Sequence, residues 1–209
     1  MNLTDMTVKE FLSELASDSP APGGGSVAAL AGAAGAALCA MAARLTIGRE
    51  KRRDAWKEME GLRDEASSLG ERLGALVDED AEAYAAVVAA RRLPKATEAE
   101  HAARGAALRD AVIRSARVPL ETLTILRSLV GCAAQAVDRG NPSCLTDAGS
   151  AAQMVRAGAM AAAYNVRVNL PDIADAQMRD SLRAQAAEAL AAVRKEIERL
   201  EAIVEGRLT

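Results

Sequence analysis

Apolar residues recur at steps of three and four along most of the chain, which predicts helices rather than strands. The capping-box sequence Thr7-Val-Lys-Glu10 begins a short apolar run and predicts a first helix that ends near Ser17. A longer stripe predicts a helix over about 52–92, with inward positions at Leu62, Ala66, Leu69, Leu73, Leu76, Val77, Tyr84, Val87 and Val88. No segment alternates apolar and polar residues as a half-buried strand does, so the expected fold class is all-α.

Capping and breaking residues divide the second half of the chain into further helices. A second capping box, Thr97–Glu100, begins a helix that Pro119 should kink or interrupt and that Gly140 ends. An alanine-rich helix over about 143–168 follows, and a last helix runs from near Asp175 to about Glu205. We therefore expect one antiparallel multi-helix bundle with long helices.

The composition predicts a single domain that binds neither nucleic acid nor metal. The 209 residues suffice for one core and contain no linker or repeat, so a single domain over 1–209 is expected. A net charge of −3 and 2% aromatic residues argue against nucleic-acid binding. Three cysteines without metal-ligand spacing and a single histidine predict no metal site and favour a reduced, cytoplasmic protein. The first residues do not resemble a signal peptide.

The stretch Ser19–Ala43 is uncharged and consists mainly of alanine and glycine. Gly23, Gly24 and Gly25 allow a sharp turn or a close approach, and Ser26 is expected to cap the helix that follows. The free N–H groups at the start of that helix suit an anionic ligand. The alternative interpretation is that the glycine loop only begins a close-packed core helix. Because large aliphatic residues are few, we expect a buried helix and no membrane span.

Asp80 is the member of an acidic cluster that shares the register of the apolar stripe. It lies seven residues after Leu73 and seven before Val87, whereas Asp78 points about 200° away from it around the helix. A buried carboxylate is costly without a partner, and burial raises its pKa, as expected for a general acid or base. A carboxylate paired with a buried cation or amide for structural reasons fits the same pattern.

Three polar residues, Asp147, Asn165 and Asn169, share one face of the alanine-rich helix. Five turns, about 27 Å, separate Asp147 from Asn165, so they cannot hold one small group within a monomer. They fit an extended ligand, a site completed by a second subunit, or buried polar groups that only satisfy the backbone. Together with Lys95 and the glycine loop, they are the residues that remain to support carboxylate chemistry at Asp80.

Seven motifs follow one another along the chain. They are Pro20-Ala-Pro-Gly-Gly-Gly-Ser-Val-Ala-Ala, Asp78-Glu-Asp-Ala-Glu-Ala-Tyr84, Arg92-Leu-Pro-Lys95, Val118-Pro119, Gly140-Asn141, Asp147 with Ser150, and Asn165-Val-Arg-Val-Asn-Leu170. Together they resemble the cyclodeaminase domain of formiminotransferase-cyclodeaminase and the free-standing bacterial methenyltetrahydrofolate cyclohydrolases of the same superfamily. The likeness covers essentially the whole chain, without a formiminotransferase domain. Ser143-Cys144-Leu145 departs from it, at a place where the family varies.

The resemblance implies an all-helical homodimer that acts on a one-carbon derivative of tetrahydrofolate, with no further cofactor. It implies Asp80 as the proton acceptor, in agreement with the register argument. The substrate-binding candidates are Gly23, Gly24, Gly25, Ser26, Lys95, Asn141, Asp147, Asn165 and Asn169. Lys95 and the glycine loop are assigned to the glutamate tail from charge alone.

The expected reaction is hydrolysis of 5,10-methenyltetrahydrofolate to 10-formyltetrahydrofolate, because the chain stands alone as the bacterial cyclohydrolases do. Formiminotetrahydrofolate cyclodeamination with release of ammonia is the close alternative. A second alternative is a non-enzymatic helical interaction protein whose small-residue helix is only an interface. That alternative explains the close packing but gives no reason for Asp80 on an apolar stripe.

Overall fold

The computed structural model describes residues 2–209, and every regular element in this range is a helix. The α-helices are α1 (Val8–Leu15), α2 (Gly24–Thr46), α3 (Trp56–Arg92), α4 (Glu98–Arg139), α5 (Leu145–Asn169) and α6 (Ala176–Leu208). Short 3₁₀ turns lie at Leu3–Asp5, Glu50–Ala55, Pro142–Cys144 and Leu170–Asp172. The all-α class is therefore confirmed.

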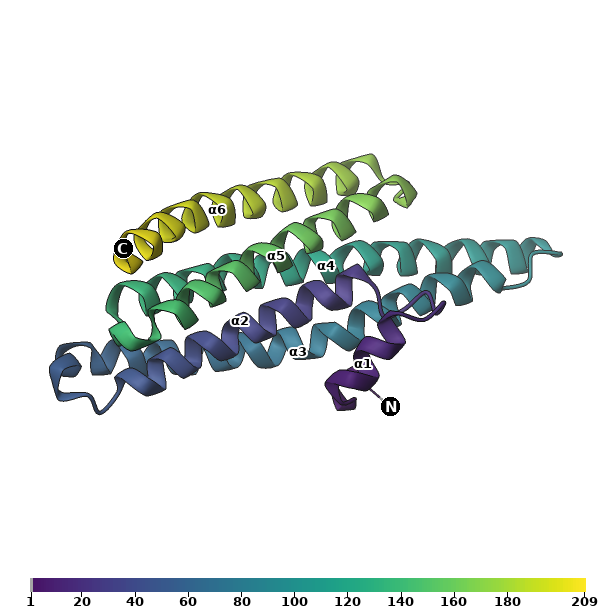
Figure 1. Cartoon of the computed structure of the whole chain (residues 1–209). Coiled ribbons are helices and arrows are strands. Elements are labelled where there is room, and N and C mark those ends of the chain that lie inside the picture. Colours follow the sequence, from purple (N-terminus) through teal and green to yellow (C-terminus); the bar gives the residue numbers. More distant parts are fainter. Residues whose placement is uncertain (1) are drawn as a thin grey trace.

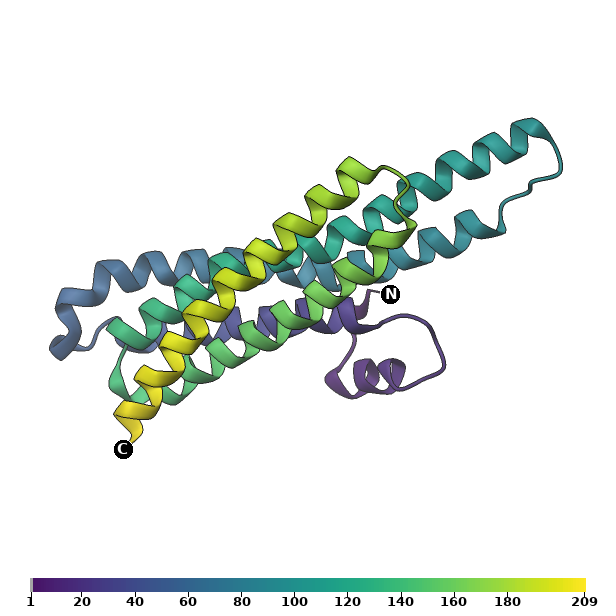
Figure 2. The same ribbon diagram turned by 90° about the horizontal axis from the view of Figure 1, so that it is seen from above.

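Helices α2 to α5 form an elongated antiparallel bundle, and α6 lies over α4 and α5 as an outer layer (Figure 1). The hairpin of α3 and α4 projects beyond the other helices at one end, as the view from above shows (Figure 2). Because α2 and α5 run in opposite directions, the N-terminus of α2 meets the C-terminus of α5. This meeting point lies beside α3, at the end from which the hairpin projects.

Helix α2 packs against α3, α4 and α5. Its small residues let the neighbours approach closely: a Cβ on Gly32 would lie 2.6 Å from Leu126 Cδ2. By length and composition, α2 and α4 are each apolar enough to cross a membrane. However, 56% and 61% of their apolar windows are buried inside the protein, as expected for core helices.

Most helix ends follow the sequence signals. Thr7 accepts a hydrogen bond from the Glu10 N–H while the Glu10 carboxylate accepts from the Thr7 N–H, so the first capping box is formed. The second capping box, Thr97 with Glu100, has the same reciprocal bonds. The side chain of Asp175 caps α6 by accepting from the Met178 N–H.

The prediction that the helix restarts at Pro119 is wrong, because α4 runs without a break from Glu98 to Arg139. Pro119 is buried in the middle of this helix, which packs against α3, α5 and α6. Contacts on both sides of the proline hold the two halves in one helix, and they outweigh the local penalty of the missing N–H.

Candidate functional site

The carboxylate of Asp80, in the second half of α3, lies against the first turn of α2. The Ser26 hydroxyl donates a hydrogen bond to Asp80 Oδ2 at 3.1 Å. A Cβ on Gly25 would lie only 2.1 Å from Asp80 Oδ1, which is closer than non-bonded atoms can approach. Gly25 is therefore required because the carboxylate touches the helix backbone.

The start of α2 differs from the sequence-based expectation. The N-cap residue is Gly23, without a capping side chain, and Ser26 lies inside the first turn with its hydroxyl directed to Asp80. Gly23, Gly24 and Gly25 have no positive φ angle, so none of them is needed for a left-handed turn. A close approach requires glycine at Gly25 and is tight at Gly24, whereas a Cβ on Gly23 would make only ordinary contact. The free N–H groups of the helix already face an anion, because Asp80 supplies the negative charge from within the protein.

Burial raises the pKa of Asp80 above its ordinary value, and this effect outweighs the hydroxyl and backbone N–H of Ser26, which lower it. Within residues 2–209, no cationic side chain contributes to the pKa of this carboxyl group. A half-buried carboxylate with a raised pKa and no cationic partner is suited to accept a proton and release it again.

The other two acidic residues of the cluster have structural partners. The Asp78 carboxylate accepts from the Leu3 N–H and from the Thr4 hydroxyl, which ties the N-terminal turn to α3. Glu79 forms an ion pair with Arg72, and this cation holds the pKa of Glu79 below its ordinary value. The prediction that Asp80 alone faces the bundle is confirmed by this arrangement.

The C-terminal turn of α5 places Asn165 beside the same helix start. A Cβ on Gly24 would lie 3.2 Å from Asn165 Nδ2, so the amide sits against the first turn of α2. Asn165 Nδ2 donates to the Ala161 carbonyl at 2.9 Å. Its Oδ1 accepts no hydrogen bond from the part of the chain that the structure describes, and it is available to a ligand.

Asn169, one turn later, uses its amide group inside the protein. Its Nδ2 donates to the Ser115 carbonyl of α4 at 2.9 Å and to the Asn165 carbonyl of α5 at 2.8 Å. Both amide hydrogens are therefore engaged inside the protein, which leaves the side-chain oxygen of Asn169 as its group for a contact with substrate.

Two candidate residues lie at the opposite end of the bundle. The Asn141 N–H donates to Thr46 Oγ1 at 2.8 Å, and its side-chain amide donates to the Leu45 carbonyl at 3.3 Å, so it closes the C-terminus of α2. Asp147 lies in the first turn of α5 at the same end. The length of α2 separates this end from Gly24 by about 33 Å, so one chain does not bring these residues to Asp80.

Lys95 is also separate from Asp80. It is exposed in the loop between α3 and α4, beyond Arg92 at the end of α3. The rise along α3 from Asp80 to Arg92 is about 18 Å. Only a long ligand can contact both groups.

Exposed aromatic and apolar side chains near Asn165 and Asp80 escaped the sequence reasoning. Tyr84 is one turn after Asp80 and was expected on the buried stripe, yet it is 44% exposed. Tyr164 and Val168, close to Asn165 on α5, are 57% and 70% exposed. The four-residue step from Asp80 to Tyr84 was the signal for a shared face, because side chains four residues apart on a helix are neighbours.

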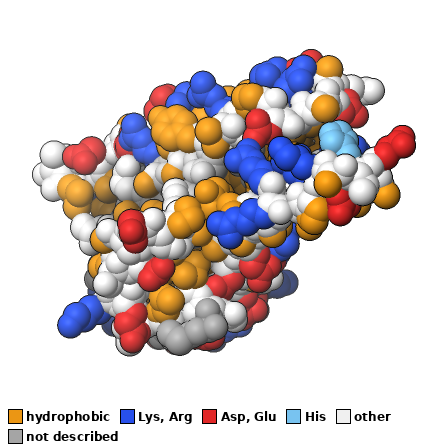
Figure 3. Space-filling view, turned by 90° about the vertical axis from the view of Figure 1, so that its right-hand side faces the viewer, with side chains coloured by type: hydrophobic (Ala, Val, Ile, Leu, Met, Phe, Trp, Pro, Cys, Tyr) orange, Lys and Arg blue, Asp and Glu red, His pale blue; other side chains and the backbone are white. Residues whose placement is uncertain are grey.

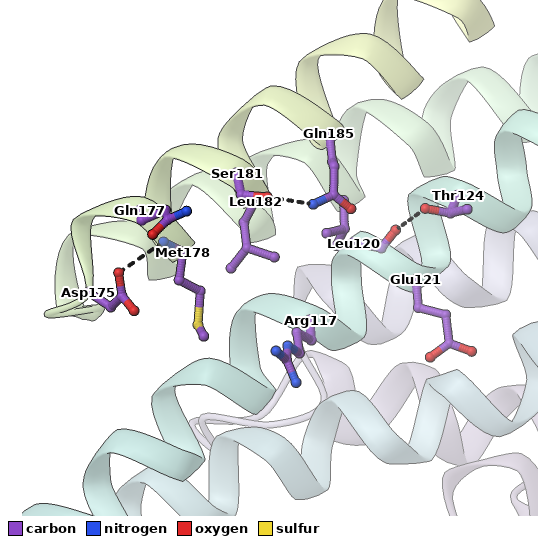
Figure 4. Close-up of a pocket in the computed structure, with 10 residues that line it drawn as sticks. All are labelled: Arg117, Leu120, Glu121, Thr124, Asp175, Gln177, Met178, Ser181, Leu182 and Gln185. Carbon is purple, nitrogen blue, oxygen red and sulfur yellow. Dashed lines mark hydrogen bonds between the residues drawn. The ribbon is translucent and has the colours of Figure 1, made fainter.

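A groove of about 630 Å³ lies elsewhere, between α4 and the start of α6. Figure 4 shows its lining residues, among them Arg117, Glu121 and Asp175. Asp175 is engaged as the cap of α6 and Glu121 in an ion pair with Arg72. The groove thus offers no free pair of titratable groups, and the candidate site remains the cluster at Asp80.

The family model of formiminotransferase-cyclodeaminase matches residues 7–188, which include the whole cluster around Asp80. The chain belongs to the formiminotransferase-cyclodeaminase family. It is 37% identical over 169 residues to a methenyltetrahydrofolate cyclohydrolase from Methylorubrum extorquens, with 81% of each chain covered. The resemblance found in the sequence is thereby confirmed.

Two further relatives in this family show how its members differ in length. The formimidoyltransferase-cyclodeaminase of Rattus norvegicus is 35% identical over 182 residues, a match that covers 87% of this chain but 34% of that protein. A crystal structure of formiminotetrahydrofolate cyclodeaminase from Thermotoga maritima has a TM-score of 0.88 and 26% identity, and the match covers 98% of both chains. The helical bundle is thus a fold of this family.

Proposed function

We propose that this chain hydrolyses 5,10-methenyltetrahydrofolate to 10-formyltetrahydrofolate. The observation that carries the proposal is the half-buried Asp80 carboxylate, held by Ser26 at the N-terminus of α2 without a cationic partner. The 37% identity to a methenyltetrahydrofolate cyclohydrolase over 81% of both chains supports the choice of reaction.

The chemistry suits a single carboxylate. The methenyl carbon between N5 and N10 is cationic, and an ionised Asp80 attracts it. Water attacks this carbon while Asp80 accepts a proton from the water, which gives a tetrahedral hydroxymethylene bridge. The bond from carbon to N5 then breaks as Asp80 returns its proton to N5, and the hydroxyl proton leaves as the formyl group forms on N10. General acid–base catalysis of this kind raises the reaction rate by about 10²- to 10⁴-fold.

Cyclodeamination of formiminotetrahydrofolate is the second candidate function. The observation that favours it is the Thermotoga maritima cyclodeaminase, which matches this chain along 98% of both lengths. In this reaction N10 attacks the carbon of the protonated formimino group, and Asp80 accepts the N10 proton and returns it to the resulting amino nitrogen, which leaves as ammonia while the methenyl bridge forms. The two reactions share the tetrahedral carbon and the carboxylate, so the geometry of Asp80 serves either.

A direct comparison of both substrates tests the proposal. Loss of methenyl absorbance and release of ammonia are measured on one preparation, with Asp80→Asn as the inactive control. We expect a larger kcat/KM for methenyltetrahydrofolate. A larger value for the formimino substrate would reverse the order, and no Asp80-dependent turnover of either would remove the enzyme assignment.

Residues beside Asp80 and at the tip of the α3–α4 hairpin indicate how an extended substrate lies. We assign the pterin edge to Asn165 Oδ1 and the backbone at Gly24, and the glutamate tail to Lys95. Figure 3 shows basic side chains gathered near exposed apolar surface on the end of the molecule with the hairpin. Lys95→Ala should raise KM for a polyglutamylated substrate more than for a monoglutamate and leave kcat unchanged.

A second copy of the chain is the partner that we propose for the outer face of α2 and α5. The outward residues of α2 are apolar and uncharged from Gly24 to Ala43. The adjoining face of α5 carries Met154, 37% exposed, and Tyr164. Two adjacent helices of this length cover about 700 Å², close to the ~800 Å² per partner of a standard interface.

This homodimer also gives Asp147 a role at the site. A twofold axis across this face with antiparallel α5 helices brings Asp147 of one chain towards Asn165 of the other. Ala34→Glu, on the outer face of α2, should yield monomers in light scattering, whereas the matched Ala184→Glu on exposed α6 should not. A monodisperse wild-type monomer with full activity would contradict the homodimer.

A further inference from the structure

Two features of the sequence have no role in the proposed chemistry: the buried proline within α4 and the asparagine that ends α5. Pro119 has no N–H, so the carbonyl of Ser115, four residues earlier, lacks its helical partner. The Asn169 side chain reaches across from α5 and donates to this same carbonyl at 2.9 Å. The proline and the asparagine therefore form one unit.

This pair of residues is connected to the candidate site. The same nitrogen, Asn169 Nδ2, donates to the Asn165 carbonyl at 2.8 Å, so it joins α4 to the last turn of α5. That turn carries the Asn165 side chain, which lies against Gly24 at the start of α2. Because α5 ends at Asn169 and a 3₁₀ turn follows, its last turn has few other bonds to hold it.

We propose that Asn169 is a positioning residue, which uses the carbonyl freed by Pro119 to fix Asn165 beside the first turn of α2. A proline in the middle of a helix normally costs stability. Here it leaves the Ser115 carbonyl without its backbone donor, so the Asn169 amide is the group that satisfies this carbonyl, and the bond ties α5 to α4. Asp80 itself is held by Ser26 from α2, so the unit acts on substrate binding rather than on proton transfer.

The kinetic part of this inference rests on the proposed function. Pro119→Ala restores an N–H that competes with Asn169 for the Ser115 carbonyl. We expect this variant to keep its stability in urea yet to raise KM about tenfold, the equivalent of about 1.4 kcal/mol, with kcat changed less than about threefold. A merely structural role of Pro119 would not raise KM in a variant that is as stable as the wild type.

A double-mutant cycle tests the link without any activity measurement. Asn169→Leu should lower the folding equilibrium constant about 5- to 100-fold, because the Ser115 carbonyl loses its partner. In the Pro119→Ala background the same substitution should cost clearly less, because the backbone N–H restored by that change now donates to the Ser115 carbonyl. Ser115→Ala is the matched control, because it keeps the carbonyl and removes only a hydroxyl that bonds within α4.

The outcomes separate this inference from the proposed function. Equal costs of Asn169→Leu in both backgrounds would overturn the link, and an unchanged KM in both single variants would overturn the positioning role. If neither folate is turned over, the stability cycle still decides whether the link exists. Should Asn169→Leu fail to fold, Asn169→Ala takes its place in the same cycle.

Discussion

The two ends of α2 both receive polar groups from other segments, yet only one of them is equipped for chemistry. At the C-terminal end, Thr46 accepts from the Asn141 N–H, and the Asn141 amide donates to the Leu45 carbonyl. These groups are neutral and mutually hydrogen-bonded. At the N-terminal end, the Asp80 carboxylate has the Ser26 hydroxyl and, within residues 2–209, no cation.

This difference separates a structural closure from a working site. A neutral, fully bonded helix end stabilises the fold, because each polar group keeps a partner after it leaves water. A half-buried charge without a cation costs stability, and its retention fits a function that needs a proton acceptor. The two ends thus predict opposite effects of mutation: loss of activity at Asp80 and loss of stability at Asn141.

Asp80→Asn is expected to have the largest effect. Because an amide cannot accept and return the proton, kcat should fall about 10²- to 10⁴-fold while the protein still folds and binds folate. The matched control is Asp78→Asn, two residues away, whose carboxylate holds the Leu3 and Thr4 turn. Steady-state kinetics of both variants check the prediction, and equal losses of kcat would contradict it.

Gly25→Ala should have the next largest effect, although it adds only a methyl group. The Cβ would lie 2.1 Å from Asp80 Oδ1, so the carboxylate must move. We expect kcat to fall about 10- to 100-fold, because misplacement of a catalytic group by about 1 Å is costly. Gly24→Val is the comparison: it crowds Asn165 at 3.2 Å and should raise KM more than it lowers kcat.

The sequence predicts the fold well, because helix periods and capping boxes are local signals. The register of Asp80 against Leu73 and Val87 likewise needs only helix geometry. It does not predict that Ser26 bonds to Asp80 or that Asn169 bonds to the Ser115 carbonyl. Those contacts join positions more than fifty residues apart, and no local pattern encodes them.

Asn141→Ala should reduce stability with little change in activity. The substitution removes the amide that closes on the Leu45 carbonyl and the oxygen that accepts from the Ser143 N–H. Loss of such cap bonds costs about 0.5–2 kcal/mol. Urea unfolding should show this loss, while kcat/KM of the folded variant should remain within about twofold of wild type. A large fall in kcat/KM would instead place Asn141 in the site, through a second subunit.

The smallest effect concerns pH. The folded pKa of Asp80 is raised, so the folded state binds its proton more readily than the unfolded chain. This residue's contribution to stability therefore falls as pH rises from its ordinary pKa, 3.8, through the raised value, and above that value the ionised carboxylate costs stability. Asp80→Asn should then melt at the same or a higher temperature than wild type at neutral pH, and its advantage should shrink in acid.

Activity should follow the opposite course, since kcat/KM needs the ionised form and falls as pH drops through the raised pKa. Melting temperatures and kcat/KM measured over one pH series check both trends. If Asp80→Asn instead lowers the melting temperature relative to wild type at neutral pH, and lowers it less in acid, the ionised carboxylate serves structure.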